Sequence, residues 1–525
     1  CSTEDLTQKP NYVKLSETLH PKRTWDPNYR EDHEDVVPTG TAPCKTACPA
    51  HIPVQGYLKL AAQGRYTDAL ELIKKENPFP AVCGRICNKR CEAECTRGSV
   101  DEAVAIDEVK RFIADHDLHE ATRYVPKLLN QIGRPYTEKI AVIGAGPAGM
   151  SCAYYLANKG YPVTVFDRNP VPGGMLTLGI PSFRLEKDVL NAEIDILREM
   201  GVEFQCGVEV GRDITIEQLR AQGYKGFYVA IGAQKSAKLR IPGEELEGVY
   251  GGVDFLRAVN LGHETHIGKR CAVIGGGNVA MDVTRSSIRL GASKVTCVYR
   301  RRLEDMTALP DEVAGATAEG AEMMTLAAPV RIEADEDGVA RALWVQPQII
   351  GDVDGSGRPK PNKAALDQVR IPADIILVAI GQGIEIQGFD QAGVPITRGG
   401  RLVAALSGQV SDMDNIFAGG DCVTGPATAI RAIAAGKVAA ANIDEHLGFH
   451  HEIRVDVDIP APRLNNRPPH GRINTTERQA CERKCDFEDI ECGLTEEGAV
   501  TEASRCLRCD HFGYGIFRGG RDIKW

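Results

Sequence analysis

The sequence lacks an apolar run of membrane-spanning length, a basic excess and an N-terminal secretory signal. The run ADIILVAIG at 373–381 has the length of a buried strand, whereas a membrane helix needs about 20 apolar residues. A net charge of -10 argues against nucleic acid as the main partner, because a phosphate-binding surface needs a basic excess. We therefore expect a cytoplasmic protein that neither spans a membrane nor binds nucleic acid.

Cysteine is abundant, yet the chain lacks the small size and the secretory signal of a disulfide scaffold. Six of the 17 cysteines lie between 44 and 95, and five lie between 481 and 509. We interpret these two groups as metal ligands. Five cysteines stand singly in the middle of the chain and are interpreted as small buried hydrophobic residues. They are Cys152, Cys206, Cys271, Cys297 and Cys422.

The chain of 525 residues is too long for one hydrophobic core, and common domain sizes indicate about three or four units. Residues 1–40 are polar and interrupted by proline, which predicts an extended arm. Between 41 and 135 the apolar spacing is helical and the cysteines fall in loops. A proline-rich stretch after 450 predicts that 451–525 is a linker followed by a cysteine-rich tail.

Two stretches repeat the order strand, glycine turn, helix, strand. They begin at 139 with KIAVIGAGPAG and at 269 with KRCAVIGGGNVAMD, about 130 residues apart. In the first, Gly144, Gly146 and Gly149 have G-x-G-x-x-G spacing, which permits a tight turn, close approach of a pyrophosphate and close helix packing. Asp167 follows the second strand, where a carboxylate accepts hydrogen bonds from ribose hydroxyls.

The second glycine turn ends its second strand differently. After Gly275, Gly277 and Ala280 the chain reaches not an acid but the run Arg300–Arg302. Guanidinium groups suit the 2′-phosphate that distinguishes NADP from NAD, so NADPH is favoured over NADH. A solvated basic turn would explain the same run.

A third stretch, IFAGGDCVTGPATAIRAIAAGKVAAANI at 416–443, supports a flavin at the first turn. It reads as a strand, a Gly-Gly-Asp turn and an alanine-rich helix, which places Asp421 where a ribityl chain and an isoalloxazine ring are held. The segments at 228–233 and 377–382 would carry the chain between two nucleotide domains. We therefore predict a discontinuous FAD-binding domain, 136–255 and 375–450, with an NADPH-binding domain, 256–374, inserted. Neither contains C-x-x-C, so no disulfide-reductase active site is expected.

The chain from about 43 to 445 resembles the small subunit of glutamate synthase and its relatives. The resemblance lies in PFPAVCGRIC, GAGPAG, GGMLTLGIPSFRLEKDVL, GGGNVAMD, VYRRRLEDMTALPDE and AGGDCVTGPATAI. The relatives include the N-terminal half of dihydropyrimidine dehydrogenase and the large subunit of electron-bifurcating NADH-dependent ferredoxin:NADP oxidoreductase. The resemblance implies an α/β fold, with a helical iron-sulfur domain before two Rossmann-like, glutathione-reductase-like domains. It also implies FAD, NADPH and one or two [4Fe-4S] clusters.

The chain departs from this family in its cysteines. The family's first group is C-x2-C-x4-C-x3-C-P, whereas here Val36 and Thr39 stand in place of the first pair and Cys44 and Cys48 remain. In relatives a Glu or Gln can complete a cluster. The matching residue here is Lys110, which cannot be a ligand while it is protonated.

The tail segment TEASRCLRCD at 501–510 looks like the helix and C-x2-C pair that precede the first group in relatives. By that resemblance, one cluster is expected on Cys44, Cys95, Cys506 and Cys509. The other is expected on Cys48, Cys87 and Cys91, with Cys83 as the fourth ligand. A separate zinc or iron-sulfur site in the tail, which would also use Cys481, Cys485 and Cys492, is the alternative.

The leading functional prediction is an electron-transfer subunit in which NADPH exchanges a hydride with FAD and electrons pass through clusters to partner subunits. Two functions fit this class. One is a flavin-bifurcating transhydrogenase-type subunit that works with ferredoxin and NAD, which the altered cysteine groups favour; the other is the NADPH-dependent glutamate synthase small subunit. A non-catalytic scaffold is the alternative of another class, and the retained glycines and carboxylates argue against it. The candidate cofactor-binding residues are Gly144, Gly146, Gly149, Asp167, Gly174, Gly275, Gly277, Asn278, Ala280, Arg300, Arg301, Gly420 and Asp421.

Overall fold

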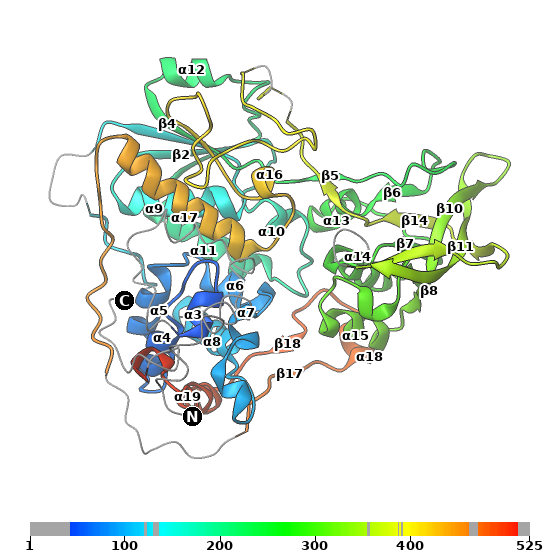
Figure 1. Ribbon diagram of the computed structural model, residues 1–525, viewed down its shortest axis with the longest axis horizontal. Coiled ribbons are helices and arrows are strands. Elements are labelled where there is room, and N and C mark those ends of the chain that lie inside the picture. The colour runs from blue at the N-terminus through cyan, green and yellow to red at the C-terminus, as the bar shows by residue number, and fades with distance from the viewer. Residues whose placement is uncertain are drawn as a thin grey trace, which may run out of the picture.

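The computed structural model describes residues 42–119, 123–129, 136–353, 358–386, 388–389, 392–460 and 471–512. The arm expected at 1–40 lies outside the described residues. Figure 1 shows a helical region at the N-terminal end of the described chain, a first α/β unit packed on it, and a second α/β unit beside both. We use these three names below.

The helical region is built from short helices around a shared apolar core. Prolines occupy the first positions of α3 and α6, where a missing backbone N–H costs nothing. The longest helix of this region, α8, has Asp107 and Glu108 in its first turn, where carboxylates are favoured by the helix dipole. Its apolar side chains pack against α4, α5 and α6. The elements are α3 (Pro43–Ala47), α4 (Val54–Ala61), α5 (Tyr66–Lys74), α6 (Pro80–Ile86), α7 (Arg90–Ala93), η2 (Thr96–Ser99) and α8 (Ile106–His119).

The first α/β unit contains a parallel sheet of order β16-β4-β1-β2-β3. Its central strands are buried almost throughout, as expected for a parallel sheet covered on both faces. Helix α17 crosses α9 very closely, because a Cβ on Gly436 would lie 2.2 Å from the Ala148 carbonyl oxygen. The elements are β1 (Lys139–Ile143), α9 (Pro147–Asn158), β2 (Val163–Asp167), α10 (Met175–Leu178), α11 (Lys187–Glu199), β3 (Glu203–Cys206), α12 (Ile216–Ala221), β4 (Tyr224–Val229), β16 (Ile416–Ala418), α16 (Asp421–Thr424) and α17 (Ala429–His446).

The second α/β unit contains a parallel sheet of order β6-β14-β7-β8-β9 and an antiparallel sheet formed by β10 to β13. Strands β6 and β14 were expected in the flavin domain, within 136–255 and 375–450, but they pair here. The chain crosses between the units through the antiparallel pair β5 (Lys235–Ser236) and β15 (Gln382–Gly383). The other elements are β6 (Val249–Gly251), α13 (Gly252–Asn260), β7 (Arg270–Ile274), α14 (Asn278–Arg289), β8 (Lys294–Val298), η3 (Leu303–Asp305), α15 (Pro310–Ala318), β9 (Glu322–Met324), β10 (Ala327–Ala334), β11 (Ala340–Val353), β12 (Pro359–Lys363), β13 (Val369–Pro372) and β14 (Ile375–Val378).

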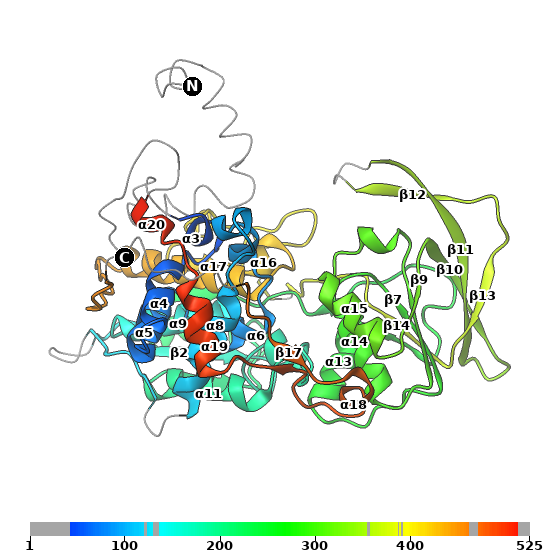
Figure 2. The same cartoon turned by 90° about the horizontal axis from the view of Figure 1, so that it is seen from below.

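The C-terminal segment returns from the second unit to the helical region, as Figure 2 shows. A small hairpin of β17 (Thr476–Glu477) and β18 (Glu491–Cys492) encloses α18 (Ala480–Arg483). Helix α19 (Glu496–Ser504) then packs on α4 and α8 and leads to α20 (Cys509–Phe512). The two parallel sheets and the helical region confirm the predicted fold class. No helix within the described ranges combines the length and the apolar character needed to cross a membrane.

Candidate functional site

A large cavity opens at the carboxyl ends of the strands in the first unit, the edge at which parallel sheets bind nucleotides. Its empty volume is about 910 Å³. Ile143 ends β1 and Asp167 ends β2, and the segment 230–234 follows β4. The cavity brings together five of the candidate residues, namely Gly144, Gly146, Asp167, Gly174 and Asp421.

The glycines of the first turn have different surroundings. A Cβ on Gly144 would lie 2.3 Å from the Ala230 carbonyl oxygen, and one on Gly149 would lie 1.8 Å from the Gly144 carbonyl oxygen. These two glycines permit close backbone packing. At Gly146 the nearest heavy atom to a Cβ, the Gly174 Cα, is 4.0 Å away. The missing side chain of Gly146 therefore leaves space at the start of α9, where a phosphate group fits.

Asp167 is hydrogen-bonded to the backbone of the turn it faces. Its Oδ2 accepts from the Ala145 N–H at 2.6 Å, and its Oδ1 accepts from the Asn169 N–H at 2.7 Å and side-chain amide at 2.8 Å. A carboxylate has about four lone-pair positions, so one position remains for a hydroxyl in the cavity. The predicted position of this carboxylate is thus fixed by the fold itself.

Asp421 begins α16 and also lines the cavity. Burial raises the pKa of Asp421 to about 6, and the Ala427 N–H, which donates to its Oδ1 at 3.2 Å, opposes that rise. The preceding Gly420 has φ of 73°, and a Cβ there would lie 2.8 Å from the Ala148 Cβ. The Gly-Gly-Asp turn thereby lies directly against the start of α9.

The loss of flavin is the expected result of Asp421→Ala. Its carboxyl is a half-buried polar group of a residue that lines the cavity, and removing it leaves the ligand without that partner. The flavin absorbance retained after gel filtration measures the effect, with the exposed Asp414→Ala as the matched control. Full retention of FAD by Asp421→Ala would contradict the role.

The second glycine turn repeats this geometry with its own sheet. Gly275 has φ of 154°, and a Cβ there would lie 2.3 Å from the Ala379 carbonyl oxygen. Gly277 caps α14, and Ala280 lies one turn into that helix. Asn278 is already engaged, because its Oδ1 accepts from the Leu309 N–H at 2.9 Å.

The three arginines after β8 have different surroundings. Arg300 is exposed, whereas Arg301 is buried and its Nε donates to the Pro359 carbonyl oxygen at 2.8 Å. Arg302 pairs with Asp305 at 2.9 Å. Of the two predicted phosphate-binding arginines, the structure leaves the exposed Arg300 facing solvent and directs Arg301 toward β12.

We expect Arg300→Ala to weaken NADPH binding about tenfold and to leave NADH binding unchanged. A charge-assisted hydrogen bond contributes about 1.5–3 kcal/mol, and NADPH alone offers the 2′-phosphate. Titration of both nucleotides by calorimetry measures the effect, and Arg301→Ala tests the second candidate. Equal losses for both nucleotides in Arg300→Ala would exclude a phosphate contact there.

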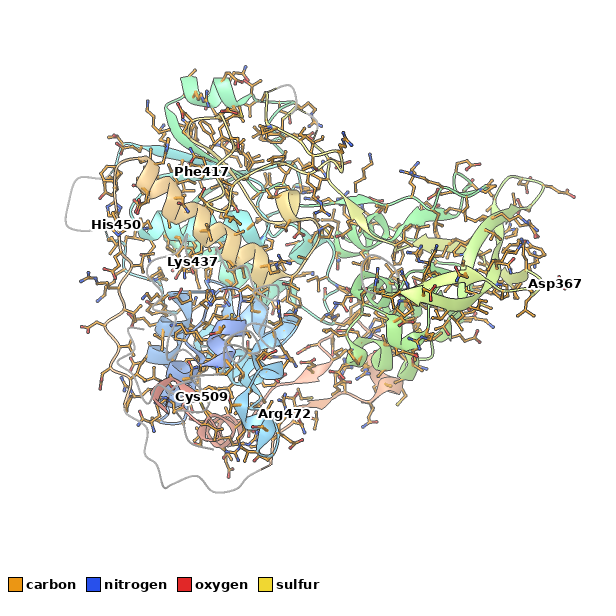
Figure 3. The ribbon with its side chains drawn as sticks, in the orientation of Figure 1. Asp367, Phe417, Lys437, His450, Arg472 and Cys509 are labelled. Atoms are coloured by element: carbon orange, nitrogen blue, oxygen red, sulfur yellow. The ribbon has the colours of Figure 1, made fainter. Side chains whose placement is uncertain are left out.

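Four cysteines from the two ends of the described chain surround a second cavity, of about 320 Å³. Cys44, Cys95, Cys506 and Cys509 line this cavity together with Gln55. Figure 3 labels Cys509 beside the helices of the N-terminal region. Burial raises the pKa of the Cys44 thiol well above its usual value, and the three neighbouring thiols raise it further. The structure thus brings together the residues predicted for the first cluster.

The surroundings of these four thiols suit a cluster. Gln55 Nε2 donates to Cys44 Sγ at 3.3 Å, and the Arg508 N–H donates to Cys506 Sγ at 3.5 Å. In the described part of the chain, no group of three or more His, Cys, Asp or Glu side chains is arranged for a single metal ion. A [4Fe-4S] cube is larger than one ion and takes four thiolates, one for each iron. The four thiols therefore fit a [4Fe-4S] cube, and two N–H donors point at the sulfurs that would bind it.

The second group, Cys48, Cys83, Cys87 and Cys91, surrounds Lys110. Burial raises the pKa of each of these thiols, and the lysine opposes that rise. Lys110 pairs with Asp107, and both residues are buried. Burial alone would lower the pKa of Lys110, but the Asp107 carboxylate and the thiols raise it above its usual value. Lys110 therefore carries a positive charge toward the thiols and cannot be a ligand.

The remaining tail cysteines lie elsewhere. Cys481, Cys485 and Cys492 are exposed. They lie on the hairpin against the second unit, whereas Cys506 and Cys509 reach the helical region. The structure does not gather all five into one tail site. Sequence reasoning did not identify Gln55 or Asn169, whose roles depend on partners brought close by folding.

Comparison with known proteins agrees with this geometry. Residues 138–436 match the family described as pyridine nucleotide-disulphide oxidoreductase, and residues 36–122 match dihydropyrimidine dehydrogenase domain II, 4Fe-4S cluster. FprA of Mycobacterium tuberculosis, solved in complex with NADPH, shares the fold with a TM-score of 0.50 and 21% identity. That match covers 60% of this chain and 85% of FprA.

Several curated proteins are similar over much of the chain. The beta subunit of the NADP(+)-dependent formate dehydrogenase of Moorella thermoacetica is 36% identical, with 92% of this chain and 72% of that protein covered. The beta subunit of the NADPH-Fe(3+) oxidoreductase of Geobacter sulfurreducens is 33% identical, with 89% and 75% covered. The NADPH glutamate synthase small chain of Escherichia coli is 36% identical, with 77% and 88% covered.

The cofactors predicted from the sequence, FAD, NADPH and a [4Fe-4S] cluster, are those that these two family matches support. The predicted enzyme class, an NAD(P)H-dependent flavin and iron-sulfur oxidoreductase, is likewise confirmed. The chain belongs to the pyridine nucleotide-disulphide oxidoreductase family, in the branch that includes the glutamate synthase small chain and carries an N-terminal 4Fe-4S domain.

Proposed function

We propose that this chain is the NADP(H)-linked electron-transfer subunit of a larger redox complex. The observation that supports this most is the cavity lined by Cys44, Cys95, Cys506 and Cys509. An enzyme that only moved hydride between NADPH and a small substrate would not need a cluster site. A cluster accepts single electrons, so its presence on a nicotinamide-dependent flavoprotein points to a one-electron partner.

Each predicted residue has a separate task in this proposal. When bound, FAD accepts a hydride from NADPH and the clusters carry single electrons. Gly146 and the start of α9 hold the FAD pyrophosphate, and Asp167 accepts from its ribose. Asp421, which lines the same cavity, binds the flavin part of FAD. Gly277 and Arg300 hold NADPH. Residues 136–236 and 382–450 form the flavin domain and residues 237–381 the NADPH domain, because the chain crosses at β5 and β15 and Leu239, Ile241 and Leu246 pack on the core of the second unit.

The cluster sites have tasks of their own. Cys44, Cys95, Cys506 and Cys509 bind one cluster, and Cys48, Cys83, Cys87 and Cys91 bind the second. The positive charge of Lys110 partly neutralises the second set of thiolates, which would otherwise repel one another in a buried site. The protein therefore supplies orientation and charge, and no acid–base pair is required.

The share of this chain that each relative covers helps to choose among partners. The match to the formate dehydrogenase beta subunit covers 92% of this chain, whereas the match to the glutamate synthase small chain covers 77%. The former match thus extends over more of this chain than the latter. We propose a complex of that kind, in which the partner is another redox subunit. The finer proposal is flavin-based bifurcation with ferredoxin and NAD.

Anaerobic purification of the chain with its native partners tests the proposal. We expect a brown complex in which NADPH bleaches the flavin and then reduces the clusters, seen by visible absorption and electron paramagnetic resonance. Bifurcation predicts that the complex exchanges electrons with ferredoxin and NAD only when both are present, whichever direction the electrons flow. Isolation of an amidotransferase partner would favour glutamate synthase instead. A colourless chain without flavin or iron would leave only a scaffold role.

A further inference from the structure

The two α/β units meet at a buried group of charges. Arg184, from the first unit, pairs with Asp282 at 2.8 Å and with Glu312 at 2.7 Å, both in the second unit. The preceding Phe183 also contacts the second unit, since the Arg289 guanidinium lies 3.9 Å from its ring centroid. Two consecutive residues of one unit are therefore held by the other.

A single buried carboxylate organises the second unit's side of this junction. The fully buried Glu319 accepts from Arg285 at 2.6 Å and from Arg289 at 2.6 Å. Burial would favour its neutral form, but the bonds from Arg289 and Arg285 hold the pKa of Glu319 at about 2. Glu319 is thus ionised and keeps both arginines in position over the Phe183 ring.

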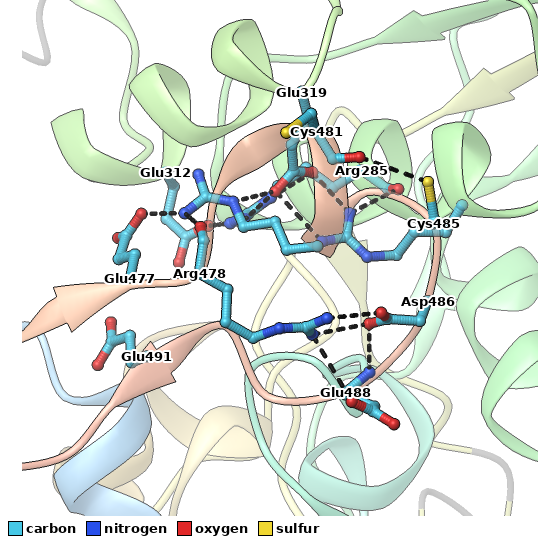
Figure 4. Close-up of polar contacts among 12 residues, drawn as sticks. Arg285, Glu312, Glu319, Glu477, Arg478, Cys481, Cys485, Asp486, Glu488 and Glu491 are labelled. Atoms are coloured by element: carbon cyan, nitrogen blue, oxygen red, sulfur yellow. Dashed lines mark hydrogen bonds and ion pairs between the residues drawn. The ribbon is translucent and has the colours of Figure 1, made fainter.

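The C-terminal segment adds a third arginine to the same carboxylate. We call residues 472–492 the strap. Arg483 of the strap is buried, and its Nε donates to Glu319 Oε1 at 3.0 Å. Figure 4 shows Glu319 and Arg285 close to Glu477 and Arg478 of the strap. The strap is therefore fastened to the second unit at the network that holds Phe183.

The strap also contacts the other two parts of the protein. The Phe487 ring lies 6.0 Å from the Phe183 ring, and the Ile490 N–H donates to the Phe183 carbonyl oxygen at 3.2 Å. In the helical region, Arg111 pairs with Asp489 at 2.5 Å. One segment of the chain therefore touches all three parts around Phe183.

We propose that the strap fixes the NADPH-binding unit against the FAD-binding unit, and that Arg483 is a positioning residue for hydride transfer. Domains of one chain move relative to each other unless their interface is large and apolar. Hydride transfer requires the reacting atoms to be about 3–3.5 Å apart, and a misplacement of about 1 Å costs roughly a hundredfold in rate. The inference rests on the NADPH-to-FAD reaction of the proposed function.

The test compares two arginines of the strap. Arg483→Met removes the bond to Glu319 in the second unit and a pair with Glu477 inside the strap. The matched control Arg478→Met removes only pairs inside the strap, to Asp486 and Glu488. We expect Arg483→Met to slow flavin reduction by NADPH about tenfold or more in stopped flow, with NADPH affinity, FAD and iron content unchanged. Arg478→Met retains the wild-type rate, and Arg483→Lys recovers part of it.

Hydrogen exchange gives a readout that does not depend on turnover. We expect the Ile490 amide to exchange faster in Arg483→Met than in Arg478→Met, because the strap no longer holds it against Phe183. Wild-type rates of both flavin reduction and exchange in Arg483→Met would overturn the proposal. If NADPH does not reduce the flavin of the wild-type protein, the proposed function is overturned, and with it the positioning role.

Discussion

Replacing Cys506 and Cys509 together by serine is expected to remove one cluster, about four irons per chain, while FAD remains bound. The two residues supply half of the thiols that line the 320 Å³ cavity, and Cys44 and Cys95 alone would leave two irons without a ligand. None of the tail residues that the structure describes lines the cavity of the first unit, so flavin absorbance reports that the fold is intact. Iron and sulfide analysis of the anaerobically purified protein measures the loss.

The tail provides its own control for this experiment. Cys481→Ser with Cys485→Ser changes the same number of thiols in the same segment, but these two are exposed and lie against the second unit. This variant should keep all of its iron. If it loses iron while the Cys506 and Cys509 variant does not, the tail carries a metal centre of its own and the assignment of the first cluster is wrong.

The sequence predicted this gathering of distant cysteines through a gap in a known pattern. Val36 and Thr39 stand where the family has its first cysteine pair, and a similar pair occurs near the other end of the chain. Spacing alone could not place Cys506 near Cys44. What fixes the tail is a set of long-range contacts, such as the bond from the Ala105 N–H to buried Glu502 at 2.8 Å.

The nucleotide turns were the most predictable part of the fold, because their chemistry is local. Gly144 and Gly275 each follow a short apolar strand and need a positive φ that other residues rarely adopt. The direction of an arginine is not local. Arg301 turns toward Pro359 on a sheet that follows it in the chain, and no feature of the run of arginines distinguishes it from Arg300.

The unit boundaries show the same limit. Strands β6 and β14 fall within the boundaries predicted for the flavin domain, 136–255 and 375–450, yet each pairs with the second sheet. Strand pairing depends on which apolar edge lies closest after folding, and the sequence pattern of a short buried strand is the same in either sheet. The chain therefore crosses to the second unit before β6, at β5, and returns after β14, at β15.

The first α/β unit and the helical region are also connected by a buried carboxylate that lies outside every sequence motif. Glu193 of α11 accepts from the Ala81 N–H at 3.1 Å and the Val82 N–H at 3.0 Å, at the start of α6. This is the favoured place for a negative charge, although burial raises the pKa of Glu193 to about 7. Because α6 carries Cys83, this contact fixes one candidate ligand relative to the flavin cavity.

Reciprocal loss of the two nucleotides is the expected result of changing one glycine in each turn. A Cβ at Gly146 would lie 4.0 Å from the nearest heavy atom, and one at Gly277 would lie 3.4 Å from Thr307 Oγ1, so the protein accommodates alanine at both positions. A phosphate group that lies against the backbone, in contrast, leaves no room for the added methyl group. Gly146→Ala should therefore weaken FAD binding at least about tenfold. Gly277→Ala should weaken NADPH binding to the same degree and leave FAD binding unchanged.

The comparison separates ligand approach from packing. Gly149→Ala would place a Cβ 1.8 Å from a backbone oxygen, so its loss of flavin would follow from damage to the turn. Gly146→Ala carries no such clash and should keep the wild-type melting temperature of the flavin-free protein. Full FAD content in Gly146→Ala, or loss of both nucleotides in either variant, would mean that the pyrophosphates do not lie on these turns. Selective loss in each would place FAD on the first sheet and NADPH on the second.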